Sequence, residues 1–314
     1  MTRVRVGIVV WNTADLLDAC LSSLPAALQG LNAEVVVVDN DSSDGSADVA
    51  DNHPAVRVIR NGTNVGYARA MNQALCADGA EEGTTDVLIA LNPDTVAPPG
   101  SLTVLAGRLL ARPDVGLMVP RLLNPDGTLQ HSVYRFPSVA VSAAAGLLPI
   151  RWQHGRLGRR FWLEGSAPHD EAGDVDWAIG AVHVIRSSAL AGCLPYDERW
   201  FMYVEDLDLC WRLAETGWRR TFEPQVSVIH VGNAAGSQAW GTGRTGRWLD
   251  ATYDWYRLRH GDFAVWRWAV VNTAGVLARL APASVRWATR RPLEEWQRDL
   301  PRALPRHLRA LGGH

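Results

Sequence analysis

The sequence predicts an α/β protein with a mostly parallel central sheet flanked by helices, followed by a C-terminal helical extension. Short runs of valine, isoleucine and leucine alternate with segments that carry apolar residues at helical spacing through the first half of the chain. This alternation is typical of parallel strands joined by right-handed helical crossovers. A change in composition near residue 240 divides the chain into two expected regions, residues 1–240 and 241–314.

The expected strands and helices follow one another in a regular order. Apolar runs bounded by polar or glycine-rich segments predict strands, and apolar residues three and four positions apart predict helices. Strands are expected at residues 4–10, 35–38, 56–60, 86–91 and 225–230, with further regular structure at 175–185. Helices are expected at residues 15–28, 46–52, 66–77 and 205–215.

Residues 130–174 break this pattern. Prolines, glycines and arginines interrupt short apolar pieces throughout this part of the chain. A long irregular segment inside a domain usually has a functional role or is mobile. We therefore expect little regular structure between these residues.

The composition excludes several classes of protein. The 314 residues have a net charge of -2, which argues against a nucleic-acid-binding protein. All 31 basic residues are arginine, so a P-loop, which requires a lysine, is excluded. The cysteines lack the short spacings of a zinc site or a disulfide framework, and we expect free, buried thiols in helical segments. They are Cys20, Cys76, Cys193 and Cys210.

The N-terminus enters the first expected strand almost at once. A basic and apolar leader does not fit before residue 4, so we expect a cytoplasmic protein. The longest uncharged run of the C-terminal region, residues 268–278, is too short to span a bilayer.

Polar side chains follow the expected strands at the points where they end. The second strand, with four successive valines, ends in Asp39 and a cluster of amides, hydroxyls and carboxylates. Open α/β sheets bind ligands at the carboxyl ends of their parallel strands. A helix opening near Gly66 would present free backbone N–H groups to a phosphate, and Asp94 supplies an oxygen ligand for Mg²⁺ or Mn²⁺. The sequence therefore predicts a site for a nucleoside diphosphate and a divalent cation.

Seven motifs in a fixed order resemble family 2 glycosyltransferases with the GT-A fold, in particular the rhamnosyltransferase-like branch. They are VVWNT, VVVDNDSSDGS, NVGYARAMN, LNPD, WAIGAVHVIRSSAL, ERWFMYVEDLDLCWRLAETGW and VIHVGNAAG. Together they cover roughly residues 4–236. Because their order and spacing match, the resemblance is far more specific than any single motif.

The resemblance implies a nucleotide site in which Asp39 accepts a hydrogen bond from a pyrimidine ring. Trp11 and Asn12 would line the base and ribose pocket. The other implied nucleotide-binding residues are Asn40 and Asn92 at neighbouring strand ends, and Asn64, Gly66, Arg69 and Asn72 near the diphosphate.

The resemblance also implies a metal site. Asn92-Pro93-Asp94 stands where the family has its Asp-x-Asp metal motif, which leaves Asp94 as the metal ligand. His230 would be a second ligand of the metal or the phosphate. The family has glycine and then serine or threonine after this histidine, whereas residues 233–235 here read Asn-Ala-Ala, so the geometry of His230 stays open. The two literal Asp-x-Asp triplets, residues 39–41 and 206–208, are not metal motifs on this interpretation.

Inverting sugar transfer requires a base that deprotonates the acceptor hydroxyl. The resemblance implies that Asp206 is this base and that Glu205 orients the acceptor or the base. On spacing alone, Asp206 could instead simply begin a helix, since carboxylates favour the first turn. The acceptor-side residues implied by the family motif are Trp177, Gly180 and Ala181, although packing in the core would equally account for Trp177.

The resemblance thus implies an inverting, metal-dependent glycosyltransferase that moves rhamnose from dTDP-rhamnose onto a glycan or lipid-linked acceptor. A UDP-sugar offers the same ring edge to Asp39, so a UDP-dependent enzyme is an alternative. A non-catalytic, nucleotide-sugar-binding scaffold associated with the membrane is the alternative from a different functional class.

The C-terminal region differs in composition from the rest of the chain. Residues 241–314 contain 13 arginines against 6 acidic residues, interleaved with tryptophans. Arginine beside tryptophan is typical of interfacial amphipathic helices, and predicts peripheral attachment to an anionic membrane on its inner face. The alternative is that these helices pack on the catalytic domain and on a second subunit of a homodimer.

Residues 241–246 match the G-x-G-x-x-G pattern of dinucleotide folds, but no apolar strand precedes them. We therefore exclude a nicotinamide site and expect a flexible loop that closes over the donor.

Overall fold

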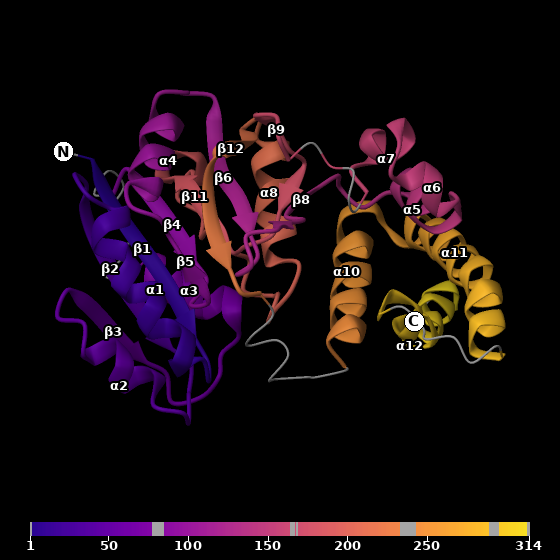
Figure 1. The fold of residues 1–314 in the computed structure, drawn as a ribbon, viewed down its shortest axis with the longest axis horizontal. Helices are drawn as coiled ribbons and strands as arrows, with labels where there is room; N and C mark the ends of the chain where they lie inside the picture. The colour runs from indigo at the N-terminus through magenta and orange to yellow at the C-terminus, as the bar shows by residue number, and fades with distance from the viewer. Residues whose placement is uncertain are drawn as a thin grey trace. The chain divides into compact units, whose positions relative to one another are not determined.

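The computed structural model describes residues 2–76, 85–163, 167, 169–232, 243–288 and 295–312. The chain forms two compact units (Figure 1). The first comprises residues 1–133 and 169–239, and the second comprises residues 134–168 and 240–314. The sequence did not predict that residues 134–168 belong with the C-terminal helices.

The first unit is built on a mostly parallel sheet, as the sequence predicts. The strand order along its main path is β3-β2-β1-β4-β11-β6-β12-β5. Strands β1, β2, β3 and β4 run parallel to one another, and β6 pairs with β12 in parallel. β11 is antiparallel to β4 and β6, and β5 is antiparallel to β12. The strands are β1 (Arg3–Val10), β2 (Asn32–Asp39), β3 (Val56–Arg60), β4 (Val87–Leu91), β5 (Thr95–Val96), β6 (Val115–Leu123), β11 (Val182–Arg186) and β12 (Arg219–His230). Short strands are β7 (Leu129–Gln130), β8 (Val133–Tyr134), β9 (Gly173–Asp174) and β10 (Trp177–Ala178).

Helices cover the sheet of the first unit and close its core. They are α1 (Ala14–Ala27), α2 (Ser46–Asp51), α3 (Tyr67–Leu75), α4 (Ser101–Leu110), α8 (Glu205–Glu215) and the short 3₁₀ helix η1 (Ser187–Leu190). Every residue of β4 is buried, as expected of a central strand covered on both faces. Gly7 of β1 lets α3 lie directly on the sheet, because a Cβ at this position would come within 2.9 Å of the Ala74 Cβ.

Four details of the first unit differ from the sequence-based expectations. β12 begins at Arg219, ahead of the expected start at residue 225, and residues 175–185 divide between β10 and β11. Helix α4 and strand β6 had not been predicted. All four cysteines are free, but Cys193 is exposed in a turn after η1 and Cys76 is half-buried at the end of α3, so only Cys20 and Cys210 are buried helical thiols.

The second unit is helical. Residues 130–174, expected to be irregular, contain the helices α5 (Val139–Leu147), α6 (Ile150–Gln153) and α7 (Arg156–Phe161). The apolar pieces between the prolines and glycines are long enough for short helices that pack together, which the sequence analysis underestimated. The C-terminal helices are α10 (Arg244–His260), α11 (Asp262–Ala288) and α12 (Glu295–Leu311).

Helix α11 is the central helix of the second unit, since it contacts α5, α10 and α12. Gly146 of α5 meets Gly275 of α11 where the helices cross, with a distance of 3.0 Å from an added Gly146 Cβ to the Gly275 Cα. The Trp268 indole N–H donates to the Ser142 hydroxyl at 2.6 Å. In the described part of the chain, no helix is both long enough and apolar enough to cross a membrane.

The expected loop over the donor is not formed as predicted. Residues 241–242 lie outside the described residues, and residues 244–246 form the first turn of α10. Gly246 is buried there, against the Arg306 guanidinium of α12.

Substitutions at two neighbouring residues of α4 test whether this helix stabilises the fold through its buried face. Leu105 is fully buried and Val104 is largely exposed. We expect Leu105→Ala to lower the free energy of unfolding by about 2–5 kcal/mol, because it leaves a cavity. Val104→Ala should change it by no more than about 0.5 kcal/mol. Urea denaturation followed by circular dichroism measures both, and equal destabilisation would contradict the packing of α4 described here.

Candidate active site

The candidate site lies in the first unit, where the parallel strands β1, β2 and β4 end. The strand register places Asp39 opposite Val10, and Leu91 opposite Ile8. The polar residues that follow these strands are therefore brought to one edge of the sheet, as the sequence predicts for a ligand site at the carboxyl ends of the strands.

Asp39 has the clearest signature of a ligand-binding residue. Its side chain is buried, and its Oδ1 atom has no hydrogen-bond partner among the described residues. Its Oδ2 atom accepts a long hydrogen bond of 3.4 Å from the Ser42 N–H. Burying a carboxylate oxygen without a hydrogen-bond donor costs free energy, and an N–H group of a bound ligand could supply that donor.

The loop after β2 is held in place by residues that follow β1. The Asn12 Oδ1 accepts from the Ser43 N–H at 2.8 Å, and the Asn12 N–H donates to the Ser42 hydroxyl at 3.1 Å. Asn12 has a left-handed backbone, with φ at 51°. Asp44 accepts from the Ala14 N–H at 2.8 Å, which ties the loop to the start of α1. Trp11 lies partly exposed beside this loop.

Asn40 and Asn64 organise the loop ahead of α3. The Asn40 Oδ1 accepts from the Val65 N–H at 3.0 Å, and its Nδ2 donates to the Asn64 Oδ1 at 2.9 Å. The Gly66 N–H donates to the same Asn64 oxygen at 3.0 Å, and the Tyr67 N–H donates to the Phe201 carbonyl at 2.7 Å. These three N–H groups, of residues 65–67, are therefore bonded to protein acceptors in this structure.

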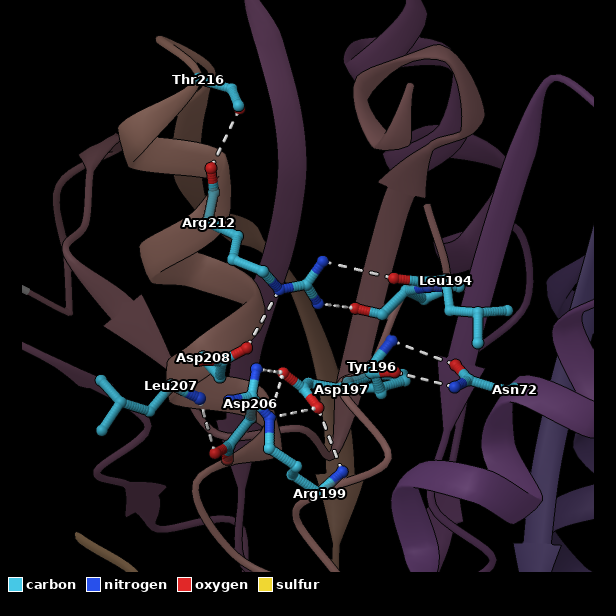
Figure 2. A network of polar contacts seen from close by, with 11 residues as sticks. Asn72, Leu194, Tyr196, Asp197, Arg199, Asp206, Leu207, Asp208, Arg212 and Thr216 are labelled. Atoms are coloured by element: carbon cyan, nitrogen blue, oxygen red, sulfur yellow. Dashed lines mark hydrogen bonds and ion pairs between the residues drawn. The ribbon is translucent and has the colours of Figure 1, made fainter. Parts of the chain in front are cut away.

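Asn72 and Arg69 face a loop from a distant part of the chain. The Asn72 amide is buried and bonds Tyr196 in both directions: its Nδ2 donates to the Tyr196 carbonyl at 2.8 Å, and its Oδ1 accepts from the Tyr196 N–H at 3.0 Å (Figure 2). Arg69 is largely exposed, with its guanidinium 4.0 Å from the Glu198 carboxylate. The Asn72 side chain thus holds this loop against α3.

Asp94 and His230 meet through the pairing of β5 with β12. Thr95 is the register partner of His230, and the Val231 N–H donates to the Asp94 carbonyl at 2.9 Å. Both side chains are buried, with the His230 Nε2 3.3 Å from the Asp94 Oδ1. The Asp94 Oδ2 accepts from the Gly232 N–H at 3.0 Å.

Gln130 fixes which nitrogen of His230 faces Asp94. The His230 Nδ1 lies 2.7 Å from the Gln130 Oε1, an atom that can only accept, so Nδ1 carries the proton and donates. The Gln130 Nε2 donates in turn to the Asn124 Oδ1 at 3.2 Å. In the neutral imidazole, the Nε2 lone pair then points toward the carboxylate. Such an orienting hydrogen bond typically accompanies a metal-ligating histidine.

The donor set at Asp94 and His230 fits a divalent cation. The Asp94 Oδ1 and the His230 Nε2 lie 3.3 Å apart, so both atoms could coordinate the same cation. In the described part of the chain no three histidine, cysteine or acidic residues converge as a metal group. Two protein ligands suit Mg²⁺ or Mn²⁺, because Mg²⁺ in particular takes its other ligands from water and substrate phosphates.

Glu205 and Asp206 begin α8 as two adjacent carboxyls with different environments. Burial, and then the charge of Asp206, raise the pKa of Glu205 well above its usual range. Burial also raises the pKa of Asp206, but hydrogen bonds from the Leu207 and Gly180 N–H groups limit it to about 6. With a pKa of about 6, Asp206 is ionised near neutral pH, the state required of a general base.

Gly180 contacts the candidate base directly. Its N–H donates to the Asp206 Oδ2 at 3.1 Å, so it orients this carboxylate. The backbone carbonyl of Ala181 accepts from the Asn92 N–H at 2.9 Å, which connects this segment to the end of β4. Trp177 is buried, as the core-packing alternative predicted.

Tyr67 is a site residue that the sequence analysis missed. Its hydroxyl lies 3.4 Å from the Asn92 Oδ1 and 3.5 Å from the Gly180 carbonyl. Burial, followed by the charges of Glu205, Asp206 and Asp94, raises the pKa of Tyr67 well above its usual value. The phenol is therefore neutral, and it stands among the three carboxyl groups of the candidate site.

The loop that leads to the candidate base has an unusual backbone. Tyr203 and Val204, immediately before Glu205, both have left-handed conformations, with φ at 71° and 61°. A β-branched residue such as valine rarely adopts this conformation, and its presence beside a site indicates a functional constraint. Arg212 of α8 anchors the start of the loop by donating to the carbonyls of Leu194 and Pro195 (Figure 2).

The two literal Asp-x-Asp triplets have no arrangement typical of a metal site. Asp208 forms an ion pair with Arg212 at 3.0 Å, four residues along α8 (Figure 2). Asp41 is exposed and has a left-handed backbone.

Comparison with known proteins identifies the family. The model of the family described as glycosyl transferase family 2 matches residues 5–166. The chain belongs to glycosyl transferase family 2. This glycosyltransferase is 29% identical, over 91% of its length and 95% of the relative's, to the N-acetylglucosaminyl-diphospho-decaprenol L-rhamnosyltransferase of Mycobacterium tuberculosis.

Solved structures confirm the GT-A fold of this glycosyltransferase. The mannosyltransferase PcManGT of Pyrobaculum calidifontis, in complex with GDP-Man and Mn²⁺, matches with a TM-score of 0.56 at 18% identity, over 98% of this chain and 85% of its own. GalNAc-T7 with UDP, GalNAc and Mn²⁺ matches with a TM-score of 0.50 at 16% identity, over 73% of this chain and 44% of its own.

The orientation of His230 in this glycosyltransferase can be tested through Gln130. We expect Gln130→Met to weaken Mn²⁺ binding, in the presence of UDP, by about 10–100-fold, because the Nδ1 proton loses its acceptor. Gln130→Glu, which keeps an acceptor, should bind Mn²⁺ almost as well as the original protein. Isothermal titration measures both affinities. If Gln130→Met bound Mn²⁺ normally, the orienting role of Gln130 would be wrong.

Proposed function

We propose that the protein transfers a sugar, with inversion at the anomeric carbon, from a nucleoside diphosphate donor to a lipid-linked acceptor, and that the donor is dTDP-rhamnose. The observation that carries the proposal is the buried Asp206 carboxylate, which accepts hydrogen bonds from the Gly180 and Leu207 N–H groups at the start of α8. The similarity over nearly the whole chain to a rhamnosyltransferase, named for a decaprenol-linked acceptor, supports the choice of sugar and acceptor.

We assign recognition of the donor's nucleobase to Asp39. Its unpartnered Oδ1 would accept the ring N–H of a pyrimidine, and Trp11 and Asn12 flank the same loop. Thymine and uracil present the same N–H to this atom. A UDP-sugar is therefore the second candidate donor.

Asp94 and His230 would hold a Mg²⁺ or Mn²⁺ ion beside the diphosphate. Once bound, such an ion offsets the negative charge that grows on the leaving diphosphate. The buried Asp94 carboxylate is fixed by the Gly232 N–H, and His230 is fixed by Gln130, so neither ligand needs to reorganise when the donor arrives. The Tyr67 hydroxyl, neutral at all physiological pH values, can donate a hydrogen bond on this side of the site.

Asp206 would take the proton of the acceptor hydroxyl as that oxygen attacks the anomeric carbon. Its pKa of about 6 leaves it ionised and still basic near neutral pH. Burial, and then the charge of Asp206, raise the pKa of the adjacent Glu205, and the Glu205 Oε2 is buried without a hydrogen-bond partner among the described residues. That oxygen is available to orient the acceptor. These features favour an enzyme over a non-catalytic scaffold.

We also propose different roles for residues 1–240 and 241–314, and a location at the cell membrane. All candidate site residues fall within residues 1–240, which supports a catalytic role for this part of the chain and a separate role for residues 241–314. A lipid-linked acceptor would place the enzyme at the inner, cytoplasmic face of the cell membrane, attached peripherally, and a homodimer is compatible with this arrangement.

Calorimetric titration tests the donor and metal assignments. We expect dTDP and UDP to bind more tightly with Mn²⁺ than without it, and GDP and NAD to bind poorly, since Asp39 reads a pyrimidine edge. In Asp94→Ala, Mn²⁺ should no longer increase the affinity for dTDP or UDP. If neither pyrimidine diphosphate bound under any metal condition, the proposed donor site would be wrong.

Substitution of the base tests the chemistry separately from binding. Asp206→Asn should lower the transfer rate by about 10²–10⁴-fold while nucleotide affinity is retained, because only the proton acceptor is lost. Asp41→Asn, at an exposed aspartate of the other triplet, should keep full activity. Turnover is measured as release of dTDP from dTDP-rhamnose, and an active Asp206→Asn protein would exclude Asp206 as the base.

The pH profile follows from the pKa of about 6 for Asp206. The base works only when ionised, so kcat/KM should be constant above this pH and fall about tenfold per unit as the pH drops below it. A profile that stays flat down to pH 5 would contradict the assignment.

A further inference from the structure

One face of α11 carries apolar side chains into the solvent. Phe263, Trp266, Val270 and Leu277 are 73%, 48%, 39% and 53% exposed, respectively. Their spacings of three, four and seven residues place them on the same side of the helix. The rings of Phe263 and Trp266 are stacked, with centroids 6.3 Å apart and an angle of 10° between the planes. The face therefore ends in a pair of aromatic side chains.

The other side of α11 already has partners within the second unit. Val265, Trp268, Ala269 and Val276 are buried, in a helix that contacts α5, α10 and α12. Among the described residues, the exposed side chains thus lie on the side of α11 opposite its buried residues. A contiguous exposed apolar surface of this kind usually marks an interaction site.

The charge of the second unit indicates what this face binds. That unit contains 18 arginines and 7 acidic residues, whereas the first unit contains 13 arginines and 26 acidic residues. Arg267, exposed on α11, adjoins Trp266 at the edge of the apolar face. Anionic lipids attract such a unit, with each arginine near the surface adding to the attraction. A second copy would instead bring two strongly basic units together, which electrostatic repulsion opposes.

We propose that the exposed face of α11, residues 263–277, binds to the surface of an anionic bilayer. Phe263 and Trp266 enter the boundary between headgroups and acyl chains, Val270 and Leu277 extend the buried strip along the helix, and the arginines of the second unit contact lipid phosphates. This surface is independent of the sugar-transfer reaction and of any nucleotide.

Co-sedimentation with vesicles tests this proposal. The full chain, without nucleotide or metal, is mixed with vesicles of phosphatidylglycerol and phosphatidylcholine, or of phosphatidylcholine alone. We expect it to pellet with the anionic vesicles and to dissociate as salt is raised. We expect the double variant Phe263→Ser, Trp266→Ser to bind the anionic vesicles at least about tenfold more weakly than the original chain. Trp248→Ser removes an exposed tryptophan of α10 in the same basic unit, and should bind like the original chain.

Three outcomes would overturn the proposal. The chain could fail to pellet with anionic vesicles at low salt, or the double variant could pellet as well as the original. Alternatively, light scattering could show a dimer that the double variant abolishes while vesicles bind neither protein, which would assign the face to a second copy. Circular dichroism of the double variant verifies that the helices remain folded, and dTDP binding verifies the first unit independently.

Discussion

The pairing of β12 with its neighbours is the constraint on which the candidate site depends. β12 runs parallel to β6 and then pairs with the short β5 in the antiparallel sense, with a register irregularity between Glu223 and Ser227. This path delivers His230 next to Asp94, although 136 positions separate them in the sequence. β7 joins the other side of β6 and brings Gln130 to the same histidine. Backbone pairing thus assembles three side chains that no local pattern connects.

Electrostatics then give chemically similar side chains different roles. Four carboxyl groups lie in the site, yet each meets a different set of donors. Asp94 accepts a hydrogen bond from a backbone N–H and faces an imidazole, and Asp206 accepts hydrogen bonds from two backbone N–H groups. The Glu205 Oε2 is buried without a hydrogen-bond partner among the described residues. Asp39 keeps one oxygen for a ligand. For the adjacent pair, burial raises the pKa of both carboxyls, and the two backbone N–H groups that Asp206 accepts lower its pKa relative to burial alone.

The sequence predicted the parallel core because β1, β2 and β4 are short apolar runs that end in polar residues, a pattern set by local burial. It located Asp39, Asp94, Asp206 and His230 through motifs. The sequence did not predict Gln130 and Tyr67 as site residues, because their roles arise from contacts across the sheet that periodicity does not encode. The sequence did not predict that the Asn40 amide bonds Asn64 and the Val65 N–H, or that the Asn72 amide bonds the Tyr196 backbone, because these partners lie elsewhere in the chain. The helices between residues 139 and 161 were missed because their apolar faces are recognisable only once α11 lies against α5.

Gly66 connects the two halves of the site mechanically. Its backbone has φ at 87°, and a Cβ would lie 2.5 Å from the carbonyl oxygen of Phe201. That carbonyl also accepts the first N–H of α3. The start of α3 and the loop before Glu205 are therefore in direct backbone contact. Any residue larger than glycine at position 66 would push this loop away from α3, so the spacing between the two sides of the candidate site is set by the absence of a side chain.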